Sequence, residues 1–120
     1  MFLKGGTIDM FDSEIKNSYF QYGFLYYTNL YVCVGSHTFD NIIFKDNNSE
    51  IGTFLYFDDI GNKRSILLIN IYNIQFLNNT ASNYGGILYS NARRKTDIKE
   101  YFKFKNCTFE NNNAMFGKYI

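Results

Sequence analysis

The sequence predicts an all-β chain that folds as a solenoid of short parallel strands, with about four to five stacked coils in one domain over residues 1–120. Three observations lead to this prediction. Asparagine is abundant beside abundant Phe and Tyr, proline is absent, and one short pattern recurs along the chain.

The composition favours short strands separated by tight turns. The chain has 13 Phe, 11 Tyr and 16 Asn, and no Pro. Asn suits turns because its short amide bonds to the nearby backbone and tolerates positive φ, whereas Phe and Tyr favour strands. A chain without Pro can donate every backbone N–H to a neighbouring strand.

The recurring pattern is Asn, two residues, Phe, two residues, Asn, and then a Gly before the chain becomes apolar again. The first Asn of each copy is Asn17, Asn41, Asn73 and Asn106. The Phe is Phe20, Phe44, Phe76 and Phe109. The second Asn is Asn47, Asn79 and Asn112, with Gly23 in the corresponding place of the first copy. The following Gly is Gly52, the pair Gly85 and Gly86, and Gly117.

The spacing of the copies predicts a solenoid. Measured from first Asn to first Asn, the first interval is shorter than the other two, which are nearly equal. Such irregular intervals are typical of coils that carry loops of different length. Apolar residues alternate with polar ones, as in Ile42 and Phe44 or Ile74 and Phe76, which favours strands over helices. The coils would then stack Phe on Phe, and Asn73 would form an amide ladder with Asn41 and Asn106.

Two of the motifs resemble a known family. The sequences FKDN (44–47), FLNN (76–79) and FENN (109–112) resemble the Phe-x-x-Asn motif of the polymorphic outer-membrane protein repeats, and GGTI (5–8) and GGIL (85–88) resemble its Gly-Gly-Ala-Ile motif. The resemblance implies a right-handed, single-stranded parallel β-helix of the pectin-lyase-like kind. It also implies a role in adhesion or as a surface spacer, and it carries over no catalytic residue.

The functional expectation is a non-catalytic β-helical repeat module of a cell-surface, adhesin-like or scaffold protein, whose partners are neighbouring coils of the same or another chain. One alternative is a carbohydrate-binding or carbohydrate-active domain, similar to a polysaccharide lyase or hydrolase, on the same fold. Another is a structural subunit of a larger intracellular assembly. We expect no cofactor, no metal and no catalytic residue, because the acidic residues are scattered and the adjacent pair Asp58 and Asp59 reads as a polar turn. The single histidine, His37, reads as a strand-edge or turn residue.

Charge and hydropathy exclude two classes of partner. With 12 basic and 11 acidic residues the net charge is +1, so nothing favours nucleic acid, and the cluster Arg93, Arg94 and Lys95 reads as a solvated loop. No apolar run is long enough for a membrane span. The start of the chain lacks the features of a signal peptide. We therefore expect a surface or extracellular location only if the chain belongs to a longer secreted protein.

Smaller features leave alternatives open. Cys33 and Cys107 would pair only if the fold brings their Cα atoms within about 7 Å, and two free thiols are the favoured interpretation. Sequons begin at Asn47, Asn78 and Asn106, close to the number expected by chance. Outward tyrosines would suit sugar or protein contact, and the candidates are Tyr22, Tyr26, Tyr27, Tyr31, Tyr56, Tyr84 and Tyr89. Because both ends fall within a copy of the pattern, we expect a longer array or end-to-end stacking.

Overall fold

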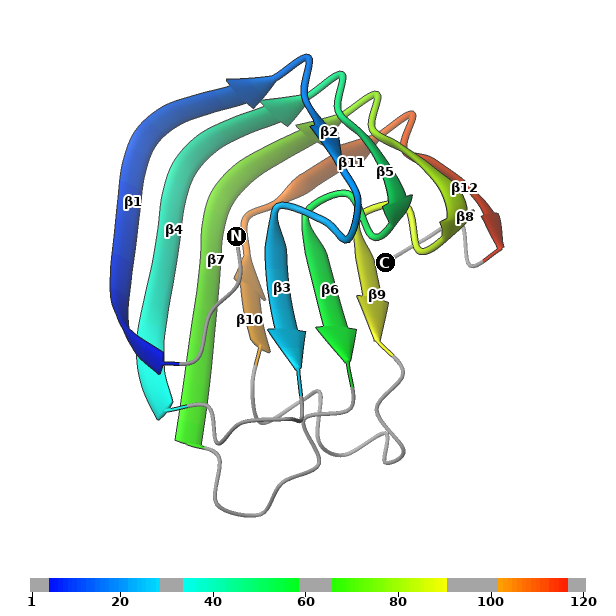
Figure 1. Cartoon of the computed structure of the whole chain (residues 1–120). Helices are drawn as coiled ribbons and strands as arrows, with labels where there is room; N and C mark the ends of the chain where they lie inside the picture. The colour runs from blue at the N-terminus through cyan, green and yellow to red at the C-terminus, as the bar shows by residue number, and fades with distance from the viewer. Residues whose placement is uncertain (1–4, 29–33, 59–65, 91–101, 117–120) are drawn as a thin grey trace.

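The computed structural model describes residues 5–28, 34–58, 66–90 and 102–116. Within these residues all regular structure is β-strand, and no helix occurs. The strands form three sheets, and every strand pair in them is parallel (Figure 1). The expectation of an all-β chain is therefore confirmed.

The first sheet contains the longest strands. Its order is β1 (Gly5–Lys16), β4 (Val34–Lys45), β7 (Ile66–Leu77) and β10 (Phe102–Lys105). A shorter strand, β11 (Thr108–Glu110), also pairs with β7. In Figure 1 the three long strands β1, β4 and β7 bend together, side by side.

The other two sheets are made of short strands. The second sheet has the order β12 (Asn113–Phe116), β8 (Thr80–Tyr84), β5 (Asn48–Ile51) and β2 (Tyr19–Phe20). The third sheet has the order β3 (Leu25–Thr28), β6 (Leu55–Asp58) and β9 (Leu88–Ser90). The chain visits the first, second and third sheets in turn and then returns to the first. We call one such round a passage, and passages 1 to 4 begin with β1, β4, β7 and β10.

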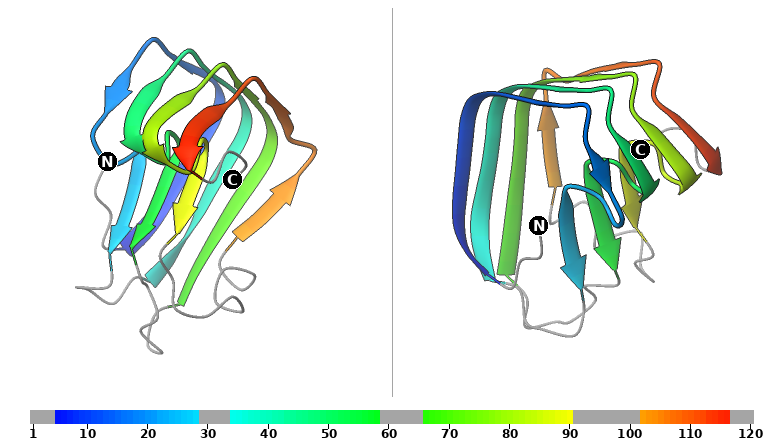
Figure 2. Two further views of the ribbon diagram at one scale, coloured as in Figure 1. Left: turned by 90° about the vertical axis from the view of Figure 1, so that its right-hand side faces the viewer. Right: turned by 45° about the horizontal axis from the view of Figure 1, so that its top comes forward.

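Figure 2 shows the passages stacked in sequence order, with β1 at one end and β10 and β12 at the other. The register shows how far the chain advances in each passage. Lys16 pairs with Lys45, Ile42 with Ile74, and Phe76 with Phe109. The interval between equivalent positions is therefore shortest between passages 1 and 2.

The register of these first two passages corrects the sequence alignment of the first copy. Phe11 pairs with Asp40 and Ser13 with Ile42, so the position beside Asn41 belongs to Asp12 and not to Asn17. The interval predicted between the first two copies is therefore wrong, whereas the later two intervals match the register. The sequence alignment failed here because Asn17 and Phe20 reproduce the Asn-x-x-Phe spacing a few residues after the equivalent positions, Asp12 and Ile15.

The space between the sheets is filled by side chains that alternate inward along the strands. Its fully buried large side chains are Leu25, Tyr27, Phe39, Ile42, Phe44, Phe54, Leu55, Phe57, Ile69, Ile71 and Phe76. Phe54 contacts the rings of Phe39, Phe44 and Phe76 with centroid distances of 5.7, 5.1 and 5.2 Å. Burying rings of this size supplies much of the hydrophobic stabilisation of a small domain.

Candidate functional site

Two columns of residues with positive φ form the outer corners of the passages. The first column contains Asp12, Asn41, Asn73 and Asn106, with φ between 49° and 56°. Its first three members lie within the long strands β1, β4 and β7, where the paired register skips them, and Asn106 lies between β10 and β11. Asn and Asp tolerate the left-handed region better than other side chains that carry a Cβ, which explains their place here.

Hydrogen bonds along this first corner column only partly follow the predicted ladder. Asn106 Nδ2 donates to Asn73 Oδ1 over 2.7 Å, as an Asn ladder requires. Asn73 Nδ2 instead donates to Asp40 Oδ1 over 2.7 Å, and Asn41 Nδ2 donates to Asp12 Oδ1 over 2.6 Å. All three contacts are exposed to solvent.

The second corner column lies where the chain leaves the first sheet for the second. It contains Asn17, Asp46, Asn78 and Asn111, with φ between 52° and 54°. All four residues are exposed. Asn17, placed by the sequence pattern with Asn41, thus belongs to this column, and its backbone N–H donates to Lys45 O over 3.3 Å.

The buried amide ladder is formed by the second Asn of each copy, namely Asn47, Asn79 and Asn112. Asn47 Nδ2 donates to Asn79 Oδ1 over 3.1 Å, and Asn79 Nδ2 donates to Asn112 Oδ1 over 2.9 Å. Asn47 and Asn79 have 0% relative exposure. We refer to these three residues as the inner ladder.

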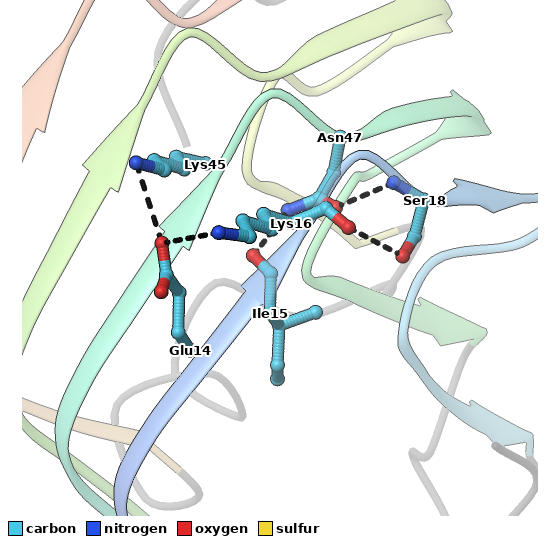
Figure 3. Close-up of polar contacts among 6 residues, drawn as sticks. All are labelled: Glu14, Ile15, Lys16, Ser18, Lys45 and Asn47. Atoms are coloured by element: carbon cyan, nitrogen blue, oxygen red, sulfur yellow. Dashed lines mark hydrogen bonds and ion pairs between the residues drawn. The ribbon is translucent and has the colours of Figure 1, made fainter.

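Each amide of the inner ladder also bonds the backbone of its neighbours. Asn79 Nδ2 donates to Phe44 O over 2.9 Å, and Asn47 N donates to Asn79 Oδ1 over 3.1 Å. Figure 3 shows the start of the ladder, where Ser18 N donates to Asn47 Oδ1 and Asn47 Nδ2 donates to Ile15 O, over 3.1 and 3.0 Å. No buried side-chain N or O atom of the described residues lacks a hydrogen-bond partner, so the ladder carries no desolvation penalty from unsatisfied groups.

The predicted Phe residues contact one another, and Phe44 and Phe76 are fully buried whereas Phe109 is exposed. Phe44 pairs with Phe76 and Phe76 with Phe109 in the register, with ring centroids 5.9 and 5.1 Å apart. Phe20 reaches Phe44 from the second sheet, with a centroid distance of 6.3 Å. The position in β1 that pairs with Phe44 is occupied by Ile15.

Glycines form a third corner, at the entrance to the third sheet. Gly23, Gly52 and Gly85 all have positive φ, at 81°, 50° and 57°. A Cβ on Gly85 would collide with Leu88 O and lie 2.8 Å from Leu88 C, both backbone atoms. Gly86 follows in this corner, where its carbonyl accepts the Thr53 N–H over 3.2 Å and the Thr53 hydroxyl.

Gly23 belongs to this glycine corner, because it shares the positive φ of Gly52, and the position of the second Asn is held by Ser18, since Tyr19 pairs with Asn48. Gly52 N donates to Tyr84 O, and Gly23 N donates to Ser49 Oγ over 3.1 Å. Ser49 and Thr53, both buried, complete the polar lining of this corner and were missed by the sequence pattern. Gly117 lies outside the described residues.

His37 lies in the interior, which corrects the prediction of a strand-edge or turn residue. It has 0% relative exposure within β4, and its Nδ1 is 2.5 Å from the hydroxyl oxygen of buried Tyr27. The alternation of His37 with Phe39 along the same strand is the sequence signal for an inward position.

Five tyrosines form a contiguous group outside the third sheet, which we call the tyrosine cluster. Its members are Tyr22, Tyr26, Tyr56, Tyr84 and Tyr89. Tyr26 and Tyr56 are stacked with a centroid distance of 5.0 Å, and Tyr56 lies 5.5 Å from Tyr89. Tyr22 and Tyr84 are 41% and 42% exposed. Tyr31, also considered for an outward surface, lies outside the described residues.

Charged contacts lie on the outer surface of the first sheet. Glu14 Oε1 lies 3.3 Å from Lys45 Nζ and 3.6 Å from Lys16 Nζ. Figure 3 draws both contacts. The hydrogen bond from Lys45 lowers the pKa of Glu14 below its ordinary value, and both lysines add favourable Coulomb attraction. Partial loss of hydration and the hydrogen bond to the Glu50 carboxylate raise the pKa of Tyr19.

The described residues bring together no group of three or more His, Cys, Asp and Glu side chains that could hold a metal ion. The Asp58 side chain, Asp59 and the basic cluster 93–95 lie outside what the structure describes. Cys107 carries a free thiol whose Sγ lies 3.4 Å from Ile71 O, and Cys33 is outside the described ranges. In the same described part of the chain there is no helix able to cross a membrane.

The three sequons differ in accessibility. Asn47 is fully buried, and its amide nitrogen makes two hydrogen bonds in the inner ladder. Asn106 is exposed but donates to Asn73. Asn78 is exposed at an outer corner, and the structure records no hydrogen bond from its side chain to the residues described.

Comparisons with known proteins identify no relative. No family model, no curated protein and no solved structure matches this chain. The functional argument therefore depends on the geometry alone.

Proposed function

We propose that the chain is a right-handed, single-stranded parallel β-helix that serves as a non-catalytic structural module of a cell-surface, adhesin-like or scaffold protein. One observation carries the proposal. Equivalent residues of successive passages lie on one another in a continuous parallel register, with Phe44 on Phe76 and Asn47 bonded to Asn79. An arrangement of this kind can be lengthened by adding passages, which is what a rod or spacer requires.

The partners of the polar groups support the same proposal. The inner ladder directs its amides to the neighbouring passages, and the corner residue Asn73 donates to Asp40 of the passage before it. Hydrogen bonds that join one passage to the next stiffen the stack along its axis. A module built in this way offers length, rigidity and a repetitive outer face.

The proposal is tested by duplicating one passage. Ile42 pairs with Ile74, so inserting a second copy of the segment 41–72 adds one complete passage in register. Small-angle X-ray scattering extrapolated to zero concentration should then show the particle lengthened by about 4.8 Å, the distance between adjacent strands, with an unchanged cross-section. Growth in all directions, or loss of folding, would contradict the β-helix.

A matched control uses a duplicated segment that is one residue shorter, 41–71. A slip of one residue turns inward side chains outward along a strand. The shorter duplication should therefore unfold at a clearly lower temperature than the duplication in register. Equal stability of the two duplications would show that the register is not what holds the passages together.

Carbohydrate binding is the second candidate, and the tyrosine cluster favours it. Aromatic side chains on a β-sheet provide an apolar body with a polar tip, which suits contact with sugar rings. The test is titration with a panel of neutral and acidic polysaccharides, followed by the Tyr56→Ala variant. Binding that is lost in Tyr56→Ala, without any unsaturated product, would favour a binding domain over both the inert module and a lyase.

A further inference from the structure

We infer that copies of this chain bind each other head to tail, with the passage 4 end of one copy seated on the passage 1 end of the next. This inference deepens the proposed function and rests on it, since it names the partner of the module as a second copy. It depends on three observations at the two ends of the stack, which Figure 2 places on opposite sides of the molecule.

The first observation is that two inward columns, those of Phe104 and Phe109, become exposed at passage 4, although Phe102 of the same strand as Phe104 stays buried. Phe39 and Ile71, in the middle passages, have 0% relative exposure, whereas Phe104 in the same column is 36% exposed. Phe44 and Phe76 are likewise fully buried, whereas Phe109 is 40% exposed. The passage 4 end thus shows rings that a further strand would cover.

The passage 1 end offers matching apolar residues in the same columns. Met10 pairs with Phe39, and Ile15 pairs with Phe44. If a second copy continues the register, its Met10 lies on Phe104 and its Ile15 lies on Phe109. Both Met10 and Ile15 are only partly buried and pack against the core.

The second observation is charge complementarity on the outer face. Lys103 lies in the column of Asn70, Thr38 and Asp9, so a second copy in register brings its Asp9 beside Lys103. Glu110 lies in the column of Leu77, Lys45 and Lys16, so Lys16 of the second copy comes beside Glu110.

These four end residues, Asp9, Lys16, Lys103 and Glu110, are exposed. Opposite charges placed directly across two strands stabilise their pairing. Contact between two passage 1 ends would instead bring together two copies of an edge on which three exposed acids, Asp9, Asp12 and Glu14, outnumber the exposed Lys16. The charges thus favour head-to-tail contact over pairing of like ends.

The third observation is that the inner ladder is open at passage 4. Asn47 Nδ2 and Asn79 Nδ2 each make two hydrogen bonds, one of them to the next ladder amide. Asn112 Nδ2 makes one recorded bond, to Phe76 O over 2.9 Å. The next position of this column in a second copy is Ser18, whose hydroxyl oxygen can accept the remaining proton of the Asn112 amide.

The first two sheets carry the proposed contact. β1 of the second copy would pair with β10 and β11, and β2 of the second copy would pair with β12. In the described part of the chain β1 and β2 have a strand partner on one side only, as do β10 and β12. A head-to-tail contact of this kind repeats without closing and produces filaments of no fixed length.

The experiment is a charge swap on the full chain, followed by sedimentation velocity over a range of protein concentrations. The unsubstituted chain should form a concentration-dependent series of oligomers. Lys103→Asp and Asp9→Lys should each weaken self-association at least about tenfold, because each sets like charges across the contact. An equimolar mixture of the two variants should associate again, because alternating copies then join opposite charges at every contact.

Glu50→Lys is the matched control, since it makes the same charge change as Asp9→Lys on β5, a strand of passage 2 that has partners on both sides. It should associate like the unsubstituted chain. A chain that stays monomeric at all concentrations, or variants that associate without regard to these charges, would overturn the inference. A monomer that still lengthens on passage duplication would leave the proposed module intact, so the two failures are distinguishable.

Discussion

The inner ladder and the outer corners use the same amino acid for opposite physical reasons. Asn78 and Asn79 are neighbours in the sequence, yet Asn78 is exposed with a φ of 54° and Asn79 is fully buried. At the corner, Asn is suited by its backbone conformation, because Asn adopts the left-handed region more readily than most residues that carry a Cβ. In the ladder, Asn is suited by its amide, which donates and accepts hydrogen bonds at the same time.

This difference predicts that the ladder position is far more sensitive than the corner. Asn79→Ala removes the acceptor of Asn47 N and Asn47 Nδ2 and the donor to Phe44 O. Because an unsatisfied buried polar group costs about 1–3 kcal/mol, we expect a loss of about 3–5 kcal/mol of unfolding free energy. Denaturant unfolding followed by circular dichroism measures it.

Asn112→Ala supplies a second variant in case Asn79→Ala does not fold. Asn112 is only partly buried and lies at the end of the ladder, so its loss should be about half as large. Equal effects at Asn79 and Asn112 would contradict the ladder, because the two positions serve different numbers of neighbours.

A substitution in the glycine corner should separate the effect of a positive φ from the effect of the limited space around the residue. Gly85 has a φ similar to that of Asn78, but a Cβ there would collide with the backbone of Leu88. Gly85→Asn should therefore destabilise by at least about 2 kcal/mol, although Asn is suited to the φ angle. The melting temperature of Gly85→Asn reports this cost, and a temperature close to that of the parent would show that the corner has room.

The sequence revealed the passages in the middle of the stack because their spacing is regular. The motifs around Phe44, Phe76 and Phe109 keep the same residues at the same offsets, and the register agrees with them. Passage 1 was misaligned because other residues satisfy the same requirements there. Asp12 occupies the corner position and Ile15 occupies the Phe position. The Asn-x-x-Phe pattern was therefore matched to Asn17 and Phe20 instead.

The role of each asparagine was harder to predict than its position. Corner and ladder residues are the same amino acid, so only the direction of the side chain distinguishes them. The sequence did contain a signal for the inward direction of Asn79, which lies three residues after the inward Phe76. The corner residue Asn78 between them shifts the inward–outward alternation by one position, so that Asn79 faces inward again. His37 illustrates the same point, since it was predicted at a strand edge or turn, whereas its alternation with Phe39 was the signal of its buried position.

Substituting the corner residue Asn78 tests whether the outer corners depend on backbone conformation and not on the Asn amide. Asn78→Gly should leave stability nearly unchanged, because Gly adopts positive φ without strain. Asn78→Ala should cost about 1 kcal/mol, the usual penalty for a Cβ in the left-handed region. Thermal unfolding of the two variants beside Asn79→Gly measures the contrast. If Gly were tolerated equally at positions 78 and 79, the ladder would carry no stability of its own.

The smallest expected effect lies on the outer face of the first sheet, where Figure 3 shows Glu14 between Lys16 and Lys45. The pKa of Glu14 is lowered in the folded chain, so its contribution to stability is present above the unfolded pKa. That contribution disappears as the pH falls through the folded value.

Lys45→Ala should move the pKa of Glu14 back toward its ordinary value, because the Lys45 hydrogen bond is the largest cause of the shift. An NMR titration of the Glu14 carboxyl measures this, with Lys16→Ala expected to shift it less. Since Glu14 and Lys16 are exposed and Lys45 is only half-buried, thermal stability should hardly change. A pKa that stays low in Lys45→Ala would assign the shift to Lys16, whereas a large loss of stability would mean that the outer face contributes as the inner ladder does.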